Sequence, residues 1–272
     1  MRTISCLDAV LVPLLLSILQ DVPEDVQRDI DTLEFMSGEA QISKATTRLG
    51  LTSYIYDKSY SHTNINDILT IDGYQRAFDL LVRVKRHGSV WLAPVCSSWV
   101  WIGRHRSGRS SSNPAGDTSQ RRIRQANSMV ARLVVLALLA WFRGCHIFLE
   151  NPLGTLVHQL SPLRELISSI LQFKVSVHLS SFGAKHPKPI VIWSSTEKVK
   201  GLKRKKKKTK EKLSIKHPDG SVSGRKHQLK ASQAYPREFG EAVSLVFKQL
   251  LVEKNTDDLL ENNIAPRRPK RR

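Results

Sequence analysis

Residues 92–99, LAPVCSSW, and residues 148–153, FLENPL, each close an apolar run that is typical of a buried β-strand. Cys96 follows the first strand directly, and Glu150 stands at the end of the second. In open α/β sheets, ligands bind at the carboxyl ends of the strands. We therefore expect a thiol and a carboxylate to lie together at one edge of a sheet.

The segments around these two strands alternate between strand and helix patterns. The expected strands are residues 32–35, 51–56, 89–93, 146–149, 175–179 and 189–193. The expected helices are residues 24–31, 40–49, 72–86, 121–142, 161–171 and 236–253. The last two strands are close in sequence, which favours an antiparallel pair. The alternation predicts an α/β fold with a doubly wound, mostly parallel sheet and a late antiparallel strand.

Changes in composition divide the chain into five expected parts. They are an N-terminal helical segment (1–31), the α/β core (32–198), a basic linker or insert (199–228), a C-terminal helix that closes the core (229–254) and a disordered basic tail (255–272). The apolar residues 7–19 are too short to span a bilayer, so they predict a packed or amphipathic helix or else a targeting segment. No membrane partner is expected. The polar residues 97–120 indicate a functional or a disordered loop.

The chain is strongly basic, with 43 Lys and Arg residues against 24 acidic residues and a formal net charge of +19. Such an excess favours a nucleic-acid partner, although solvated basic tails account for part of it. The runs at 203–208 and 267–272 are typical of nuclear-import or nucleic-acid patches, or else of solvated charge. The three cysteines, Cys6, Cys96 and Cys145, fit neither a disulfide framework nor a CxxC metal site. No metal is expected, and a reducing compartment is favoured.

Three residues before Cys96 are candidates for holding a ligand. Gly38 follows the first strand, where a glycine lets the backbone approach a bound group at the start of a helix. Asp57 ends the second strand, where a carboxylate can accept hydrogen bonds from a ribose diol. Asp67 follows at the next short apolar segment. Each acid is also compatible with a helix cap or a surface position.

Cys96 and Glu150 have two interpretations each. A thiol whose pKa is lowered is a good nucleophile for electron-poor carbon, whereas a lone cysteine is most often buried and inert. A carboxylate that ends so apolar a strand is expected to have a raised pKa and to donate a proton, whereas a capping or surface glutamate would do neither. The dipeptide Asn151-Pro152 forces an extended turn that fixes the direction of the carboxylate.

The order of these features resembles the class I S-adenosylmethionine-dependent methyltransferases, and most of all the cytosine-C5 DNA methyltransferases, over roughly residues 32–250. The resemblance implies a Rossmann-like fold in which Cys96 adds to C6 of a flipped-out cytosine and Glu150 protonates N3. It also implies S-adenosylmethionine as cofactor, and C5 would take the methyl group. Residues 229–236 and 239–243 are similar to the closing motifs of that family. The implied cofactor-binding residues are Phe35, Ser37 and Gly38 at the methionine end, Asp57 at the ribose, Asp67 and Ile68 at the adenine, and Pro94.

The chain also departs from the family pattern, at Met36, Val95 and Pro152. Lysines stand where the family has an arginine signature, and the long target-recognition region is short here. The implied nucleic-acid-binding residues are Arg104, Arg106, Arg109, Lys185, Lys188, Lys203, Arg204 and Lys205, with DNA a better candidate than RNA. Trp99 and Trp101 are expected either to stack on bases or to pack in the core.

Three hypotheses follow from these similarities to the family and departures from its pattern. The first is a divergent cytosine-C5 methyltransferase in the nucleus. The second is a nucleic-acid-binding protein that kept the cofactor fold and the basic surface but lost turnover. The third is a class I methyltransferase with another substrate, in which Cys96 is structural.

Overall fold

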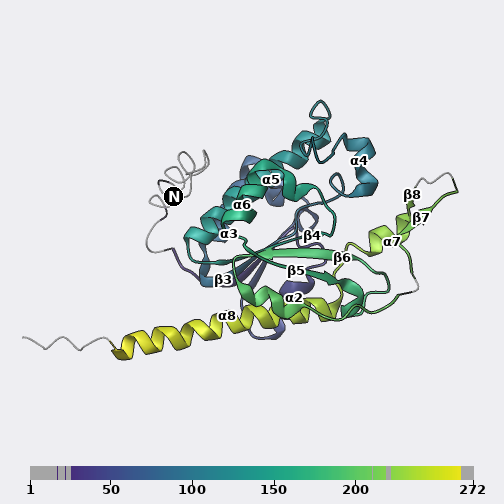
Figure 1. Ribbon diagram of the computed structural model, residues 1–272. Helices are drawn as coiled ribbons and strands as arrows, with labels where there is room; N and C mark the ends of the chain where they lie inside the picture. The colour runs from purple at the N-terminus through teal and green to yellow at the C-terminus, as the bar shows by residue number, and fades with distance from the viewer. Residues whose placement is uncertain (1–16, 18–21, 23–25, 210, 219–221, 265–272) are drawn as a thin grey trace, which may run out of the picture.

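The computed structural model describes residues 17, 22, 26–209, 211–218 and 222–264 (Figure 1). Its centre is a six-stranded, mostly parallel sheet with the order β2-β1-β3-β4-β6-β5. The strands are β1 (Ile30–Phe35), β2 (Ser53–Tyr56), β3 (Val84–Leu92), β4 (His146–Pro152), β5 (Phe173–His178) and β6 (Pro189–Ser194). Strand β6 lies between β4 and β5 and is antiparallel to both. The predicted α/β class, the mostly parallel sheet and the late antiparallel strand are confirmed.

The sheet separates two apolar clusters because successive side chains of a strand point to opposite faces. Val90 and Leu92 of β3 belong to one cluster, whereas Trp91 belongs to the other. The first cluster contains residues of α3 (Ile71–Val82), α5 (Arg121–Phe142) and α6 (Ser161–Ser169). The second contains residues of α2 (Gln41–Arg48) and α8 (Arg237–Ile264). In Figure 1 these two groups of helices lie on opposite sides of the sheet.

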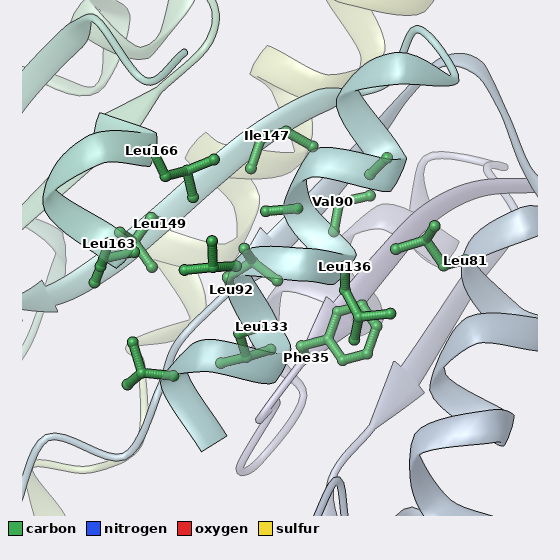
Figure 2. Packing of buried hydrophobic residues seen from close by; sticks show 14 of the residues in the cluster. Phe35, Leu81, Val90, Leu92, Leu133, Leu136, Ile147, Leu149, Leu163 and Leu166 are labelled. Atoms are coloured by element: carbon green, nitrogen blue, oxygen red, sulfur yellow. The ribbon is translucent and has the colours of Figure 1, made fainter. Parts of the chain in front are cut away.

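The packing of the first cluster shows why α5 is so apolar. Figure 2 shows Leu133 and Leu136 of this helix beside the strand residues Val90 and Leu92. Among the described residues, α5 is the one helix long and apolar enough to cross a membrane, a property that core helices share. Nine of its side chains are buried: Ile123, Met129, Val130, Leu133, Val134, Leu136, Ala137, Leu139 and Ala140.

The remaining elements are short. A separate antiparallel pair is formed by β7 (Ser214–Lys216) and β8 (Val222–Gly224), followed by α7 (Lys226–Ala231). Helix α4 (Trp101–Ser107) lies inside the segment 97–120, which was expected to be a loop. The 3₁₀ helices are Lys58–Tyr60, Asn64–Asn66, Val157–Gln159, Leu179–Phe182 and Glu197–Leu202.

Three expectations for the helices were wrong at their boundaries. Residues 26–29 are irregular and Ile30 already begins β1, so the helix expected at 24–31 does not form in its described part. Helix α3 ends at Val82 and not at residue 86, because Val84 pairs with Ile30 and is fully buried. Helix α8 continues to Ile264, beyond the expected end at residue 253, because the polar residues that follow include neither Gly nor Pro, the two residues that most disfavour a helix.

Candidate active site

The loops after β3 and β4 come together at one edge of the sheet. These strands are parallel neighbours, with Leu92 opposite Leu149. Asn151 Nδ2 donates a hydrogen bond of 3.0 Å to the carbonyl of Pro94, which ties the two loops to each other. The carbonyl of Cys96 accepts bonds from the amides of Trp99 and Val100 at 2.9 and 3.1 Å and so starts a tight turn.

The thiol and the carboxylate interact at this edge. The charges of Lys188 and Glu150 both act on the partly exposed Cys96 thiol. Glu150 is only 5% exposed, and its Oε2 accepts a 2.7 Å hydrogen bond from the hydroxyl of Tyr235. Its Oε1 is buried and has no hydrogen-bond partner among the residues that the structure describes. One oxygen of the carboxyl group is thus held, and the other is available.

Burial governs the protonation of both groups. It raises the pKa of the Glu150 carboxyl, and this rise is opposed by the charge of Lys188 and by the Tyr235 hydrogen bond. Burial thus shifts the carboxyl towards its protonated form, and the rise in pKa agrees with the expectation from the sequence. Burial also raises the pKa of the Cys96 thiol, whereas Lys188 lowers it. The lowered pKa expected of a nucleophilic cysteine is not found.

Lys188 acts on both members of this pair. It was expected to contact nucleic acid, and within the protein its Nζ donates a 2.9 Å hydrogen bond to the carbonyl of Ser232, just before Tyr235. Its charge lowers the pKa of both Cys96 and Glu150. We therefore describe Cys96, Glu150, Lys188 and Tyr235 as the thiol–carboxyl site.

A second polar group lies at the carboxyl ends of β1 and β2. Asp57 Oδ2 accepts a 2.9 Å hydrogen bond from the amide of Gly38, so the structure brings these two predicted residues together. Asp57 Oδ1 accepts bonds from the amide and the hydroxyl of Ser59. Gly38 has φ +53° and open space where a Cβ would stand. Ser37 is buried, and its hydroxyl has no hydrogen-bond partner within the described part of the chain.

Glu34 belongs to this group and was not foreseen. Its Oε2 accepts hydrogen bonds of 2.9 and 2.6 Å from the amide and the hydroxyl of Ser43, and its Oε1 is buried without a partner in the described chain. Burial raises the pKa of Glu34 to about 7, and the charge of Asp57 adds to the rise. The signal that could have revealed it is a lone carboxylate inside the apolar strand LEF.

The other expected cofactor residues are less available to a ligand. Asp67 pairs with Lys58 at 2.6 Å and accepts a 3.0 Å bond from the amide of Leu69. Ile68 and Phe35 are buried in the first apolar cluster. Pro94 is also buried, and its carbonyl is held by Asn151.

The loop after Cys96 divides its basic and aromatic residues between core and surface. The guanidinium carbon of Arg109 lies 3.7 Å from the ring centroid of Trp99, and both side chains are buried. Arg109 donates hydrogen bonds to the Ser98 hydroxyl and Asn127 Oδ1, and also to the carbonyl of Pro114. It is therefore placed as a structural residue and not at the surface. Trp99 packs in the core.

The other residues of this loop face outwards. Trp101 is 59% exposed, and Arg106 is also exposed. Arg104 Nη2 donates a 2.6 Å bond to the carbonyl of Gly154, so this arginine joins α4 to the loop after β4.

The expected lysine-rich surface lies at the same edge of the sheet. The side chains of Lys185, Lys203, Arg204 and Lys205 are exposed. The hydroxyls of Ser180 and Ser181, directly after β5, donate to the carbonyls of Lys207 and Lys205 at 3.0 and 2.9 Å. This part of the basic run is thus held against the carboxyl end of β5. We call the side chains of residues 203–208 the basic strip.

No protein-family model and no curated protein matches the chain. In the described ranges, no group of three or more His, Cys, Asp and Glu side chains is placed to hold a metal ion.

Proposed function

We propose that this protein is an S-adenosylmethionine-dependent methyltransferase that acts on nucleic acid, with cytosine C5 as its target. The observation that carries the proposal is the thiol–carboxyl site, in which Cys96 and Glu150 act on each other electrostatically beyond two adjacent parallel strands and burial raises the pKa of Glu150. The late antiparallel strand β6 and the helices on both faces of the sheet also support a doubly wound, Rossmann-like methyltransferase fold.

The reaction that this site would perform begins with a bond between Cys96 Sγ and C6 of cytosine. The thiol proton leaves to solvent, and the thiolate attacks C6. The electron pair of the C5–C6 double bond shifts to C4–C5, and that of C4–N3 moves to N3, where Glu150 delivers its proton. C5 is then nucleophilic. Release requires loss of the C5 proton to water, return of the N3 proton to Glu150 and cleavage of the Sγ–C6 bond.

The polar group at the ends of β1 and β2 fits the proposed cofactor. Its buried, unpartnered oxygens, Glu34 Oε1 and Ser37 Oγ, would accept hydrogen bonds from an ammonium group, and the space beside Gly38 admits the ligand. Asp57 would hold the ribose by exchanging its present bonds to Gly38 and Ser59 for hydroxyl groups. When bound, S-adenosylmethionine supplies a methyl group on a sulfonium centre, to which C5 is the acceptor.

The basic strip and the exposed Arg106 and Trp101 support a polymeric substrate. Ammonium and guanidinium groups bind phosphates without reading bases, and exposed aromatic rings stack on unpaired bases. We propose that the substrate is DNA and not RNA, and that the protein acts in the nucleus, because the basic runs at 203–208 and 267–272 are typical of nuclear-import or nucleic-acid patches. The second run lies outside the described residues.

A second function is favoured by one specific observation. Burial raises the pKa of Cys96, so little thiolate is present near neutral pH. A protein that binds the cofactor and nucleic acid but turns over slowly or not at all would have such a site. The left-handed Met36, at φ 54° where glycine is favoured, points the same way.

Methyl transfer from labelled S-adenosylmethionine separates these functions. The full chain is incubated with DNA or RNA beside Cys96→Ser, and the buried Cys145→Ser serves as the matched control. Transfer that Cys96→Ser abolishes and Cys145→Ser retains supports the enzyme. Binding without transfer supports the second function, and transfer that survives Cys96→Ser excludes the covalent mechanism. DNA that contains 5-fluorocytosine traps the cysteine adduct directly.

A further inference from the structure

A hollow of about 530 Å³ lies at the opposite edge of the sheet from the thiol–carboxyl site. Its residues stand at the amino ends of β1 and β3, before β2, and on α8. They are Arg28, Asp31, Leu51, Lys85, Arg86, Lys248, Leu251 and Val252. Its volume falls within the range of ligand sites, about 300–1,000 Å³.

Basic side chains outnumber acidic ones in this hollow among the described residues. Within that part of the chain, Asp31 is the one acidic residue that lines it. Asp31 Oδ1 pairs with Lys85 at 2.7 Å, and Oδ2 accepts a 2.8 Å bond from the amide of Thr52, so both oxygens are used. Arg28, Arg86 and Lys248 have no carboxylate at ion-pair distance among the residues described, and all three are exposed.

A fourth cation adds to this field. The carbonyl of Val82 accepts a hydrogen bond from Arg143, and the charge of Arg28 acts on that guanidinium. The pKa of Arg143 is lowered mainly by burial and, to a smaller extent, by the charge of Arg28. Like charges this close repel one another, and a bound anion would relieve the repulsion.

We propose that this hollow binds phosphate groups. Two guanidinium groups offer paired donors that match a phosphate, and Lys248 adds a point charge. The apolar wall formed by Leu51 and Leu251 favours a phosphate that carries a less polar part, as a nucleotide or a phosphodiester strand does. The site does not depend on methyl transfer, since none of its residues touches the thiol–carboxyl site.

Calorimetric titration of the full chain tests this assignment. The probes are pyrophosphate, adenosine triphosphate and a short oligodeoxythymidine, each at low and at moderate salt. The variants are Arg28→Gln, Arg86→Gln and Lys248→Gln. Arg164→Gln, which removes an equal charge from the exposed side of α6, is the matched control. Thermal unfolding verifies that each variant is folded.

Each hollow variant is expected to weaken binding about tenfold, which corresponds to about 1.4 kcal/mol, because one charge-assisted hydrogen bond to the phosphate is lost. The control should change affinity by less than about twofold, as a distant surface charge does. Weakened pyrophosphate and nucleotide binding assigns the site to a free phosphate compound. Weakening confined to the oligonucleotide assigns it to a phosphodiester backbone. If no probe binds, or if the hollow variants match Arg164→Gln for all three probes, the proposal is overturned.

Discussion

The hydroxyl of Tyr235 donates a 2.7 Å hydrogen bond to Oε2 of Glu150, although 85 residues separate them in the chain. The bond holds one carboxyl oxygen and leaves the proton of a neutral Glu150 to the other. Tyr235 itself remains protonated, because burial above all raises the pKa of its phenol. The tyrosine is therefore a positioning residue for the proposed acid.

Removing that hydroxyl should destabilise the protein. Tyr235→Phe is expected to lower the free energy of unfolding by about 1–2 kcal/mol, because a buried carboxyl oxygen loses its donor. Urea denaturation measures the change. Tyr74→Phe is the matched control, since burial raises the pKa of Tyr74 but its hydroxyl makes no hydrogen bond within the described chain. Equal effects of the two substitutions would contradict the role of the Glu150 contact.

The reactivity of Cys96 towards iodoacetamide should depend on two neighbours in opposite directions. The thiolate reacts, so labelling should rise with pH through a midpoint above that of a free cysteine. Lys188→Gln removes a charge that lowers the pKa of the thiol and should slow labelling at a fixed pH. Glu150→Gln removes a carboxyl whose ionised form raises the pKa of the thiol, so labelling should become faster at pH values where Glu150 would be ionised.

Mass spectrometry of the Cys96 peptide gives these rates, and the Cys145 peptide serves as an internal reference. Burial raises the pKa of Cys145 to about 12, so its labelling should stay slow in all variants. A shift of the Cys96 midpoint in the same direction for both variants would contradict the effect described for one of the two charges.

Glu34 should make stability depend on pH. Its pKa is raised from 4.5 to about 7 in the folded protein, so the folded state holds the proton more tightly than the unfolded chain. The contribution is fully favourable below pH 4.5 and declines as the pH rises to about 7, by about 3 kcal/mol in all. Glu34→Gln should remove this decline, and chemical denaturation between pH 4.5 and 8 measures it. An unchanged slope would mean that Glu34 is ionised in the fold.

Substitution of Arg109 should affect mainly the stability of the protein, whereas substitution of Arg106 should affect mainly the binding of nucleic acid. Arg109→Ala is expected to lower the free energy of unfolding by about 2–3 kcal/mol, because it removes three hydrogen bonds and the contact with Trp99. Arg106→Ala should leave stability within about 0.5 kcal/mol and weaken binding of an oligonucleotide. Thermal unfolding and fluorescence anisotropy give the two quantities. If Arg109→Ala weakens oligonucleotide binding without lowering the free energy of unfolding, Arg109 would be a binding residue and not a structural one.

Hydrophobic pattern was sufficient to predict the sheet but not all of its boundaries. The strands around residues 90 and 148 are so apolar that burial on both faces is the natural outcome. Residues 83–86 have helical propensity, and only pairing of Val84 with Ile30 makes them a strand. That contact joins distant parts of the chain, so local sequence does not contain it.

The candidate site was predictable to a similar degree. The predicted strand ends were sufficient to find Cys96, Glu150, Gly38 and Asp57. This was possible because the carboxyl ends of parallel strands lie at the same edge of the sheet. The protonation of Cys96 was not predictable, since it depends on how deeply the loop is packed and on Lys188. Arg109 was assigned to the surface because a sequence rich in Arg and Ser gives no sign that Trp99 would cover one guanidinium.

The position of β6 between β4 and β5 has a consequence for biosynthesis. One side of β4 is completed only when β6 inserts, and the phenol that holds Glu150 comes from still later in the chain. Until residues 189–194 and Tyr235 have been synthesised, Glu150 lacks both the neighbouring strand and the hydroxyl that binds its Oε2. The environment that raises its pKa therefore depends on segments that leave the ribosome well after Glu150 itself.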